Sequence, residues 1–246
     1  MKKLFLCTAF FTFVLSINGL AQTMPSMTKS EIKAEMQADK DQIKEMKKEY
    51  NEKRRKEWVI IVIHPVKLFW GVRATLYGLF FQKIGKFTYI GKPCFLEGIR
   101  KIKIGNKTRI FPGIRIQAIG NGKVDIGNNV AIEQNCHITS AESCLVIEDN
   151  VTIAANAFIT NIDHEYKDIT KSVLEQELIY KTTKIGEGSF IGYGAAIQAG
   201  TILGKHCVVG TNAVVRGTFP DYSVIVGCPA KIIKKFNLET QMWERC

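Results

Sequence analysis

The sequence predicts an all-β solenoid, a coil with three flat faces that each take six residues. The main observation is a six-residue period of branched aliphatic residues: Ile185, Ile191, Ile197, Leu203, Val209 and Val215. A glycine follows four of the six, and a small residue stands four positions after each of the first five. A period of six fits neither an α-helix nor a simple strand alternation, and a short fixed period is typical of a repeat architecture.

Each column of this repeat has a physical role. The aliphatic side chains point inward and stack into one continuous core, while glycine permits the turn between two faces. The small column includes Cys207, and Cys136 occupies the same column of an earlier coil. None of the seven cysteines has a metal or redox spacing. We therefore interpret these two as buried thiols that act as small apolar fillers, which favours a reducing compartment.

Earlier coils keep the period but are longer. Isoleucine runs at six-residue spacing start at Ile104, Ile126 and Ile147, which are 22 and 21 residues apart. Three faces of six residues need only 18, so each of these coils carries extra residues at a corner. The 26 residues from Ile159 to Ile185 are too many for one face. We expect a loop at about 161–183 to leave the solenoid there, and long loops on a rigid scaffold often carry function.

With these repeats, residues 86–236 resemble the left-handed β-helix acyltransferases of the hexapeptide-repeat family. The resemblance is greatest to sugar O-acetyltransferases of the galactoside and maltose acetyltransferase type and to polysaccharide O-acetyltransferases. It implies a left-handed parallel β-helix, which departs from the usual right-handed crossover. It also implies a homotrimer with active sites between neighbouring subunits, acetyl-CoA as the co-substrate, and no metal.

His164 stands at the root of the long loop, five positions after Ile159. Transfer of an acetyl group to a hydroxyl needs a base that takes the hydroxyl proton, and histidine suits this task near neutral pH. The resembling enzymes have their catalytic histidine at this point of the loop, so we expect His164 to be the general base. The alternative is an ordinary solvated loop histidine.

The resemblance also indicates an acceptor site, although the residue types differ. The family's substrate-binding asparagine falls on Gln134, with Asn135 beside it, and its aspartate column falls on Glu142. Asp163, which precedes the predicted base, is a further candidate. These residues keep hydrogen-bonding character but not identity, so the acceptor sugar is left open. Ordinary polar corner residues are the alternative interpretation.

Coenzyme A binding is expected mainly from backbone groups. A thioester oxyanion needs an N–H donor aimed at it, and the resemblance places such a main-chain amide in the turn formed by Gly192, Tyr193 and Gly194. The same resemblance implies a pantetheine groove farther along the chain. Its lining residues would be Thr211, Ala213 and Arg216.

The segment after the last repeat provides a further coenzyme contact. Residues 227–231 match the family's Gly-x-Pro-Ala-Lys/Arg signature, and Lys231 would meet a coenzyme phosphate as a point charge. A surface lysine is the alternative. A short tail, 237–246, closes the chain, and we expect the basic C-terminal end to be partly helical.

A metal centre is not expected. His137 and His206 invite that interpretation, because gamma carbonic anhydrases bind zinc through three histidines on a β-helix of the same type. Two of those ligand positions are Tyr193 and Gln198 in this chain, so two of three ligands would be missing.

Three segments precede the β-helix. Residues 1–21 look like a secretory signal, although an uncleaved anchor or a later translation start are alternatives. Residues 22–57 are rich in both charges, and we expect a solvated helical arm in preference to a short coiled coil. Residues 58–85 are apolar and aromatic with interspersed basic residues, which suits either a membrane interface or a helix packed on the domain.

The net charge of +11 favours an anionic ligand or surface, such as coenzyme A or a membrane leaflet. No nucleic-acid-binding signature accompanies it. We therefore expect an acetyl-CoA-dependent O-acetyltransferase acting on a sugar or polysaccharide precursor. An amino sugar, serine or an antibiotic are other acceptors of the same fold, and a non-catalytic, membrane-attached structural β-helix is the rival interpretation.

The location of the domain follows from its donor. Acetyl-CoA is a cytosolic compound, so we expect a cytoplasmic domain with residues 58–81 peripheral at the inner membrane. The signal-like N-terminal segment leaves export open.

Overall fold

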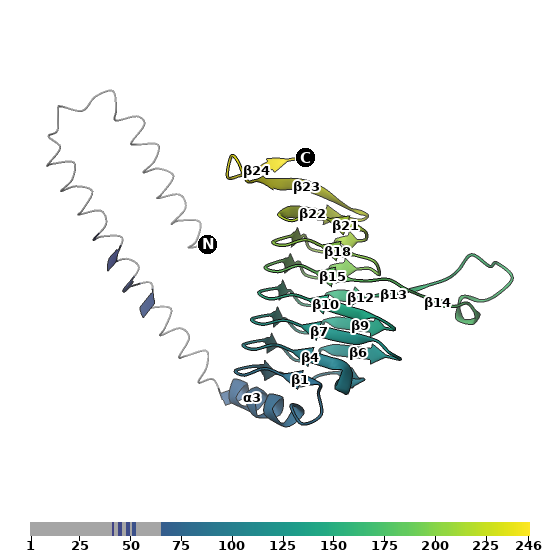
Figure 1. The fold of residues 1–246 in the computed structure, drawn as a ribbon, viewed down its shortest axis with the longest axis horizontal. Helices are drawn as coiled ribbons and strands as arrows, with labels where there is room; N and C mark the ends of the chain where they lie inside the picture. Colours follow the sequence, from purple (N-terminus) through teal and green to yellow (C-terminus); the bar gives the residue numbers. More distant parts are fainter. Residues whose placement is uncertain (1–40, 42–43, 46–47, 50, 53–64) are drawn as a thin grey trace. The chain divides into compact units, whose positions relative to one another are not determined.

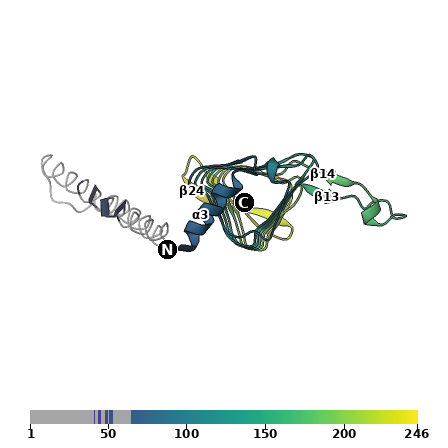
Figure 2. The ribbon, with the colours of Figure 1, turned by 90° about the horizontal axis from the view of Figure 1, so that it is seen from below.

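Three parallel β-sheets surround a single core in the computed structural model, which describes residues 41, 44–45, 48–49, 51–52 and 65–246. Each coil adds one short strand to each sheet, and successive coils stack into a prism (Figure 1). Viewed along the stack, the three sheets enclose a triangle (Figure 2). The parallel β-helix predicted from the six-residue period is therefore confirmed.

Within each sheet every third strand along the chain is a neighbour, except across the inserted loop, which adds β13 and β14, and at the C-terminal end of sheet B. Sheet A contains β1 (Lys83–Ile84), β4 (Ile102–Ile104), β7 (Lys123–Ile126), β10 (Cys144–Ile147), β15 (Lys184–Ile185), β18 (Ile202–Leu203) and β21 (Thr218–Phe219). Sheet B contains β2 (Tyr89–Ile90), β5 (Arg109–Ile110), β8 (Ala131–Ile132), β11 (Thr152–Ile153), β16 (Phe190–Ile191), β19 (Val208–Val209), β22 (Ser223–Gly227), β23 (Ala230–Asn237) and β24 (Met242–Arg245). Sheet C contains β3 (Phe95–Glu97), β6 (Arg115–Ile119), β9 (His137–Ala141), β12 (Phe158–Thr160), β17 (Ala196–Ile197) and β20 (Val214–Val215).

The inward aliphatic columns run through the whole stack. In sheet A, Ile126 pairs with Ile147, and Ile147 pairs with Ile185 across the inserted loop. In sheet C, Ile159 pairs with Ile197 in the same way. All of these side chains are buried. The loop therefore interrupts the sequence period without interrupting the core.

The early coils are longer because sheet C is wider there. Strands β6 and β9 have five residues each, whereas β17 and β20 have two. A short 3-10 helix, η1 (Ile99–Lys101), adds length after β3. The extra residues that the sequence places at the corners of these coils therefore lie at the border between sheets C and A.

The two cysteines of the small column are buried as predicted. Cys136 and Cys207 have no exposed surface. Burial raises the pKa of the Cys136 thiol to about 11 and also raises the pKa of Cys207, so both stay protonated at neutral pH. All six cysteines among the described residues are free thiols.

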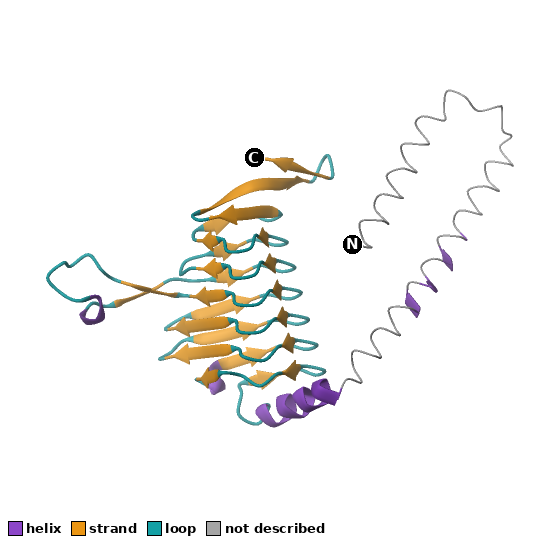
Figure 3. Cartoon of the chain, turned by 180° about the vertical axis from the view of Figure 1, so that it is seen from behind, coloured by secondary structure: helices purple, strands orange, loops and turns teal. Residues whose placement is uncertain are grey.

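Different elements close the two ends of the prism (Figure 3). Helix α3 (Pro65–Tyr77) packs against β1 and β2 of the first coil. At the other end, β23 pairs antiparallel with β22, and β24 pairs antiparallel with β23. The expectation of a partly helical C-terminal tail is wrong: the tail is a β-hairpin, because β22 offers an unpaired strand edge whose N–H and C=O groups β23 satisfies.

The structure describes only part of the N-terminal region for which the sequence makes predictions. Residues 1–21 and 58–64, and most of 22–57, lie outside the described residues. The few described positions between 41 and 52 are α-helical. Within the described part of the chain, no helix combines the length and the apolar character needed to cross a bilayer.

Ile153 of β11 tests the inward column, because its side chain is fully buried. Ile153→Ala removes packing and leaves a cavity, and we expect the free energy of unfolding to fall by about 2–5 kcal/mol. Leu238→Ala is the matched control, because that side chain is 63% exposed; its effect should stay below about 0.5 kcal/mol. Urea denaturation followed by circular dichroism measures both, and equal losses would contradict the inward column.

Candidate active site

The inserted loop forms an arm that projects from the prism (Figures 1 and 2). Strands β13 (Ile162–His164) and β14 (Leu178–Tyr180) pair antiparallel at its base. The 3-10 helix η2 (Val173–Glu175) lies toward its tip, where Ser172 and Glu175 form a capping box. The loop predicted at about 161–183 is thus an ordered hairpin that leaves the border between sheets C and A.

Asn161 anchors the root of the arm inside the protein. Its side chain is buried, and its Oδ1 accepts a hydrogen bond from the Ala141 amide at 2.8 Å. Its Nδ2 donates to Ser140 Oγ at 3.1 Å, to the Ala141 carbonyl oxygen at 3.1 Å and to Ser143 Oγ at 2.9 Å. The side chain therefore satisfies groups of the preceding coil with both of its polar atoms. No role is predicted for Asn161 from the sequence, although its position as a polar residue directly after an inward strand was the available signal.

A second set of hydrogen bonds fixes the return strand of the arm. The Thr183 hydroxyl donates to the Thr160 carbonyl oxygen at 2.9 Å and accepts from the Gly200 amide at 3.2 Å. The Lys181 amide donates to the Asn161 carbonyl oxygen at 2.9 Å. Both ends of the arm are thus attached to the prism and to each other, which makes the base of the arm a rigid support.

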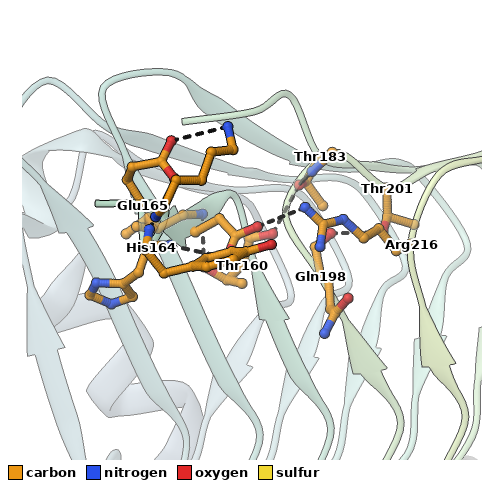
Figure 4. Close-up of polar contacts among 12 residues, drawn as sticks. Thr160, His164, Glu165, Thr183, Gln198, Thr201 and Arg216 are labelled. Atoms are coloured by element: carbon orange, nitrogen blue, oxygen red, sulfur yellow. Dashed lines mark hydrogen bonds and ion pairs between the residues drawn. The ribbon is translucent and has the colours of Figure 1, made fainter. Parts of the chain in front are cut away.

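His164, the predicted base, ends β13 and is exposed. Its backbone amide donates to Asp163 Oδ1 at 3.0 Å, while its imidazole has no hydrogen-bond partner among the described residues. Figure 4 shows the ring pointing away from Arg216 and Gln198. Both imidazole nitrogens are therefore available to a ligand.

Asp163 and Arg216 form an ion pair at the base of the arm. Arg216 donates from a guanidinium nitrogen to Asp163 Oδ2 at 2.8 Å, which joins β13 to the end of β20 across 53 residues (Figure 4). Both side chains are partly exposed, so the pair adds little to global stability. Its structural effect is to hold the residue that precedes His164.

The predicted site residues divide between two edges of sheet C. We call the corner where the chain passes from sheet C to sheet A the C/A edge, and the corner from sheet B to sheet C the B/C edge. The strand assignments place at the C/A edge Glu142, Asp163, His164 and Arg216. They place at the B/C edge Gln134, Asn135, Gly192, Tyr193, Gly194, Thr211 and Ala213. A single chain therefore does not bring the predicted base together with the predicted oxyanion donor.

Tyr193 supplies the available amide of the predicted oxyanion turn. The Gly192 amide already donates to the Val209 carbonyl oxygen at 2.9 Å, and the Gly194 amide to the Ala155 carbonyl oxygen at 3.0 Å. The Tyr193 amide has no partner among the described residues. A Cβ atom at position 192 would lie 2.7 Å from the carbonyl carbon of Gly210, so glycine is required there. The turn therefore directs one amide outward between two constrained glycines.

Three residues expected in the pantetheine groove occupy different places. Thr211 is exposed at the B/C edge, beside the Tyr193 turn in the next coil. Ala213 is fully buried inside the prism, so its side chain cannot line a groove. Arg216 lies at the opposite edge, in the ion pair with Asp163. The Ala213 side chain therefore belongs to the core, because the coil turns inward at that position, and the expected groove stays a prediction.

Lys231 lies close to the B/C edge at the end of the stack. Val209 pairs with Ile225, so the turn after β22 continues the edge that contains Thr211. Lys231 pairs with Val226 on the returning strand and is exposed. A cation is thus available at the end of the edge that presents the Tyr193 amide.

A polar network on the outer face of sheet C was not predicted. Gln117 is its centre: its Oε1 accepts from Arg115 Nε at 2.7 Å, and its Nε2 donates to Glu97 Oε2 at 2.8 Å. His137 Nε2 lies 3.3 Å from Gln117 Oε1 and 2.7 Å from the Thr139 hydroxyl. Burial, and secondarily the charge of Arg115, lower the pKa of His137, which favours a neutral imidazole. This network lies on β3, β6 and β9, between the two edges in the first three coils.

His206, the third histidine of the described residues, has a structural environment. His206 stacks on Tyr222 with a ring separation of 5.7 Å. Among the described residues, no cluster of histidine, cysteine or carboxylate side chains has the geometry of a metal site.

Comparison with known proteins identifies the family. The model for the bacterial transferase hexapeptide, described as six repeats, matches residues 182–217. The putative lipopolysaccharide biosynthesis O-acetyl transferase WbbJ of Escherichia coli is 35% identical over 164 residues, which are 62% of this chain and 81% of that protein. This chain belongs to the hexapeptide-repeat transferases. It spans only about half the length of two further relatives in this family, a probable acetyltransferase and a serine acetyltransferase.

Solved structures of an N-acyltransferase and a galactoside acetyltransferase have the same fold. The N-acyltransferase AntD of Bacillus cereus, in complex with dTDP and 3-hydroxybutyryl-CoA, has a TM-score of 0.59 at 19% identity and covers 68% of this chain and 90% of its own. A galactoside acetyltransferase in complex with coenzyme A has a TM-score of 0.52 at 22% identity and covers 71% and 74%. The resemblance stated from the repeats is thereby confirmed at the level of family and fold.

Asn161→Ala tests the anchor of the arm. The substitution leaves the Ala141 amide and carbonyl without their buried partner, and we expect a loss of about 1–3 kcal/mol in the free energy of unfolding. Hydrogen exchange of the arm should also become faster. Asn121→Ala is the control, because Asn121 is exposed and its side chain bonds only Glu142 at 3.0 Å. If both variants unfold alike and the arm exchanges at the original rate, the anchor assignment fails.

Proposed function

We propose that this chain transfers an acetyl group from acetyl-CoA to a hydroxyl group of a sugar or a polysaccharide precursor. The observation that carries the proposal is the exposed position of His164. Its imidazole has no hydrogen-bond partner among the described residues, and it lies on a strand whose root is held by hydrogen bonds. The relative WbbJ is named as an O-acetyl transferase of lipopolysaccharide biosynthesis, and the galactoside acetyltransferase was solved with coenzyme A. Both names support this donor and this class of acceptor, and the donor in turn favours a cytoplasmic location.

His164 acts as the general base in this proposal. The acceptor oxygen attacks the carbonyl carbon of the thioester while its proton passes to the imidazole. A carbon–oxygen bond forms, and negative charge develops on the former carbonyl oxygen. On collapse the carbon–sulfur bond breaks, the acetyl ester leaves, and the departing thiolate takes the proton from the imidazolium.

The Tyr193 amide is the proposed oxyanion donor. It is the unpaired amide between Gly192 and Gly194, and it is held in place by the backbone bonds of both glycines. A fixed N–H aimed at developing charge needs no reorganisation during the reaction. Thr211 and Lys231 would contact coenzyme A along the same edge, and Lys231 would pair with a phosphate.

The acceptor would bind beside the arm. Glu142 and Asp163 share the C/A edge with His164, and Gln134 and Asn135 would contribute from the B/C edge of a neighbour. Arg216 is a positioning residue here, because its guanidinium holds Asp163 at 2.8 Å and touches no atom of His164 in any hydrogen bond. This assignment replaces the expected contact of Arg216 with the pantetheine chain.

The separation of the two edges favours a homotrimer with shared active sites. In a closed ring, the C/A edge of one copy can face the B/C edge of the next, which would unite base and oxyanion donor. The arm supports this arrangement, because Ile169 and Leu174 near its tip are 95% and 90% exposed. Large apolar side chains at the end of a projecting arm are typical of a contact with another chain.

His164→Ala tests the base. We expect the fold and coenzyme A binding to persist, because the exposed imidazole contacts no core residue, while kcat falls by about 10²–10⁴-fold. His206→Asn is the control, because His206 stacks on Tyr222 and has a left-handed backbone that asparagine tolerates. Steady-state transfer from acetyl-CoA to a panel of sugars measures both. Unchanged turnover by the His164→Ala protein would remove the base assignment.

The same assay separates the coenzyme site from the base. Lys231→Ala should raise KM for acetyl-CoA and leave most of kcat, because a contact made equally in the ground state and the transition state affects binding alone. A fall in kcat with unchanged KM would contradict the proposed phosphate contact.

Mixed trimers test whether the site is shared. His164→Ala damages the C/A edge, and Thr211→Trp blocks the B/C edge with a bulky side chain. If each site uses one edge from each of two copies, random mixing leaves about a quarter of the sites intact, so two inactive variants should regain about a quarter of the wild-type rate when co-expressed. No recovery, or a monomer in light scattering, would contradict the shared site.

A further inference from the structure

Helix α3 has one face inside the domain and one face outside it. Trp70 packs on Tyr89 and Phe111 with ring separations of 6.1 Å and 5.6 Å. Arg73 donates to the Ile90 carbonyl oxygen at 3.1 Å, and Ala74 is buried. Of the two alternatives that the sequence leaves open for this segment, packing on the domain is therefore observed for one face of α3, and the membrane interface stays a prediction for the other.

The outer face of α3 and the turn after it are apolar. We call this surface the α3 patch, and it consists of Leu68 (68% exposed), Phe69 (69%), Val72 (53%), Leu76 (57%), Leu79 (79%) and Phe80 (55%). Successive helical residues are about 100° apart, which places positions 68, 69, 72 and 76 on one side of the helix. Contiguous exposed apolar side chains of this kind mark an interaction site.

The charges around the patch have one sign. Residues 65–96 contain five basic side chains, Lys67, Arg73, Lys83, Lys86 and Lys92, and no aspartate or glutamate. The last three are exposed on the first coil. An apolar helix face with basic flanks and no carboxylates is the composition of a helix that lies in the interface of an anionic membrane.

Phe87 supports the same conclusion from a corner of the first coil. Its side chain is 84% exposed although its φ is 57°, a conformation that bulky residues rarely adopt. The equivalent corners of later coils carry Lys107, Asn129, Asn150, His206 and Tyr222 with the same backbone, so the conformation belongs to the corner, and Phe87 differs from them by its exposed, wholly apolar ring. Neither the core nor the local backbone explains an aromatic residue here, whereas an aromatic ring at the headgroup level of a bilayer does.

We propose that the α3 patch, together with Phe87 and the neighbouring lysines, docks the domain on an anionic lipid leaflet. In this proposal the helix lies on the leaflet and does not cross it. This agrees with the described helices, none of which has the length and apolar character needed to span a bilayer. The occupant is a lipid surface because the charge around the patch is uniformly positive; a second copy of this chain would oppose these cations with themselves. The proposal does not depend on the chemistry of His164.

Vesicle binding of the full chain tests the proposal. The probes are phosphatidylcholine vesicles with and without about 30% phosphatidylglycerol, which supplies the anionic charge. F69S/L76S/L79S removes three exposed side chains without touching the core, and we expect the partition coefficient on anionic vesicles to fall by about 10–100-fold. L238S/M242S is the matched control, because it removes exposed apolar side chains from the C-terminal hairpin at the other end of the prism; its binding should stay within about twofold.

Two further measurements separate lipid from other occupants. K83E/K86E should weaken binding to anionic vesicles alone, and hydrogen exchange of residues 65–80 should slow when anionic vesicles are added. The proposal is overturned if F69S/L76S/L79S binds like the wild type, since another segment would then be responsible. It is also overturned if the wild type binds both vesicle types equally, or if the patch variant changes the oligomeric mass in light scattering, since a second copy would then cover the patch. Circular dichroism of each variant ensures that lost binding is not lost folding.

Discussion

The features of this protein depend on the fixed distance between stacked coils. Neighbouring strands lie about 4.7–4.9 Å apart, and this spacing leaves no room for a Cβ atom at position 192, which would lie 2.7 Å from a backbone carbon of the next coil. Every outward side chain is consequently aligned with its counterparts above and below, as Gln117 is with Thr139 and Thr139 with Thr160. The polar row on sheet C results from this alignment.

The fold could be predicted from the sequence, because few folds place an inward-pointing aliphatic residue at every sixth position. The position of a residue within the period also indicates its edge: Tyr193 comes two positions after Ile191, and His164 comes five after Ile159. Contacts between residues that the six-residue period does not relate could not be predicted from the sequence. The Asp163–Arg216 pair spans 53 residues, and the hydrogen bonds of Asn161 depend on how the arm leaves the corner. The C-terminal hairpin was missed because the open edge of β22 outweighs local helical preference.

The two ends of the solenoid cover their terminal coils with different elements. A terminal coil exposes core on one side, and repeat proteins cover it with atypical elements. Here β23 and β24 extend sheet B at one end, while α3 covers the first coil at the other. Because cyclic symmetry places equivalent surfaces in one plane, three α3 patches of the proposed trimer would face the same lipid surface. Weak docking of one helix would then be strengthened by the other two.

The arm also has an evolutionary consequence. Its two ends leave and rejoin the prism at neighbouring points, joined by the bond from the Lys181 amide to the Asn161 carbonyl oxygen, and the aliphatic columns continue beneath it from Ile147 to Ile185. Everything between these ends can therefore change in length and composition while each core contact persists. In the proposed enzyme, insertions or substitutions within the arm would therefore reshape the acceptor side of the site while the solenoid that supports it stays as it is.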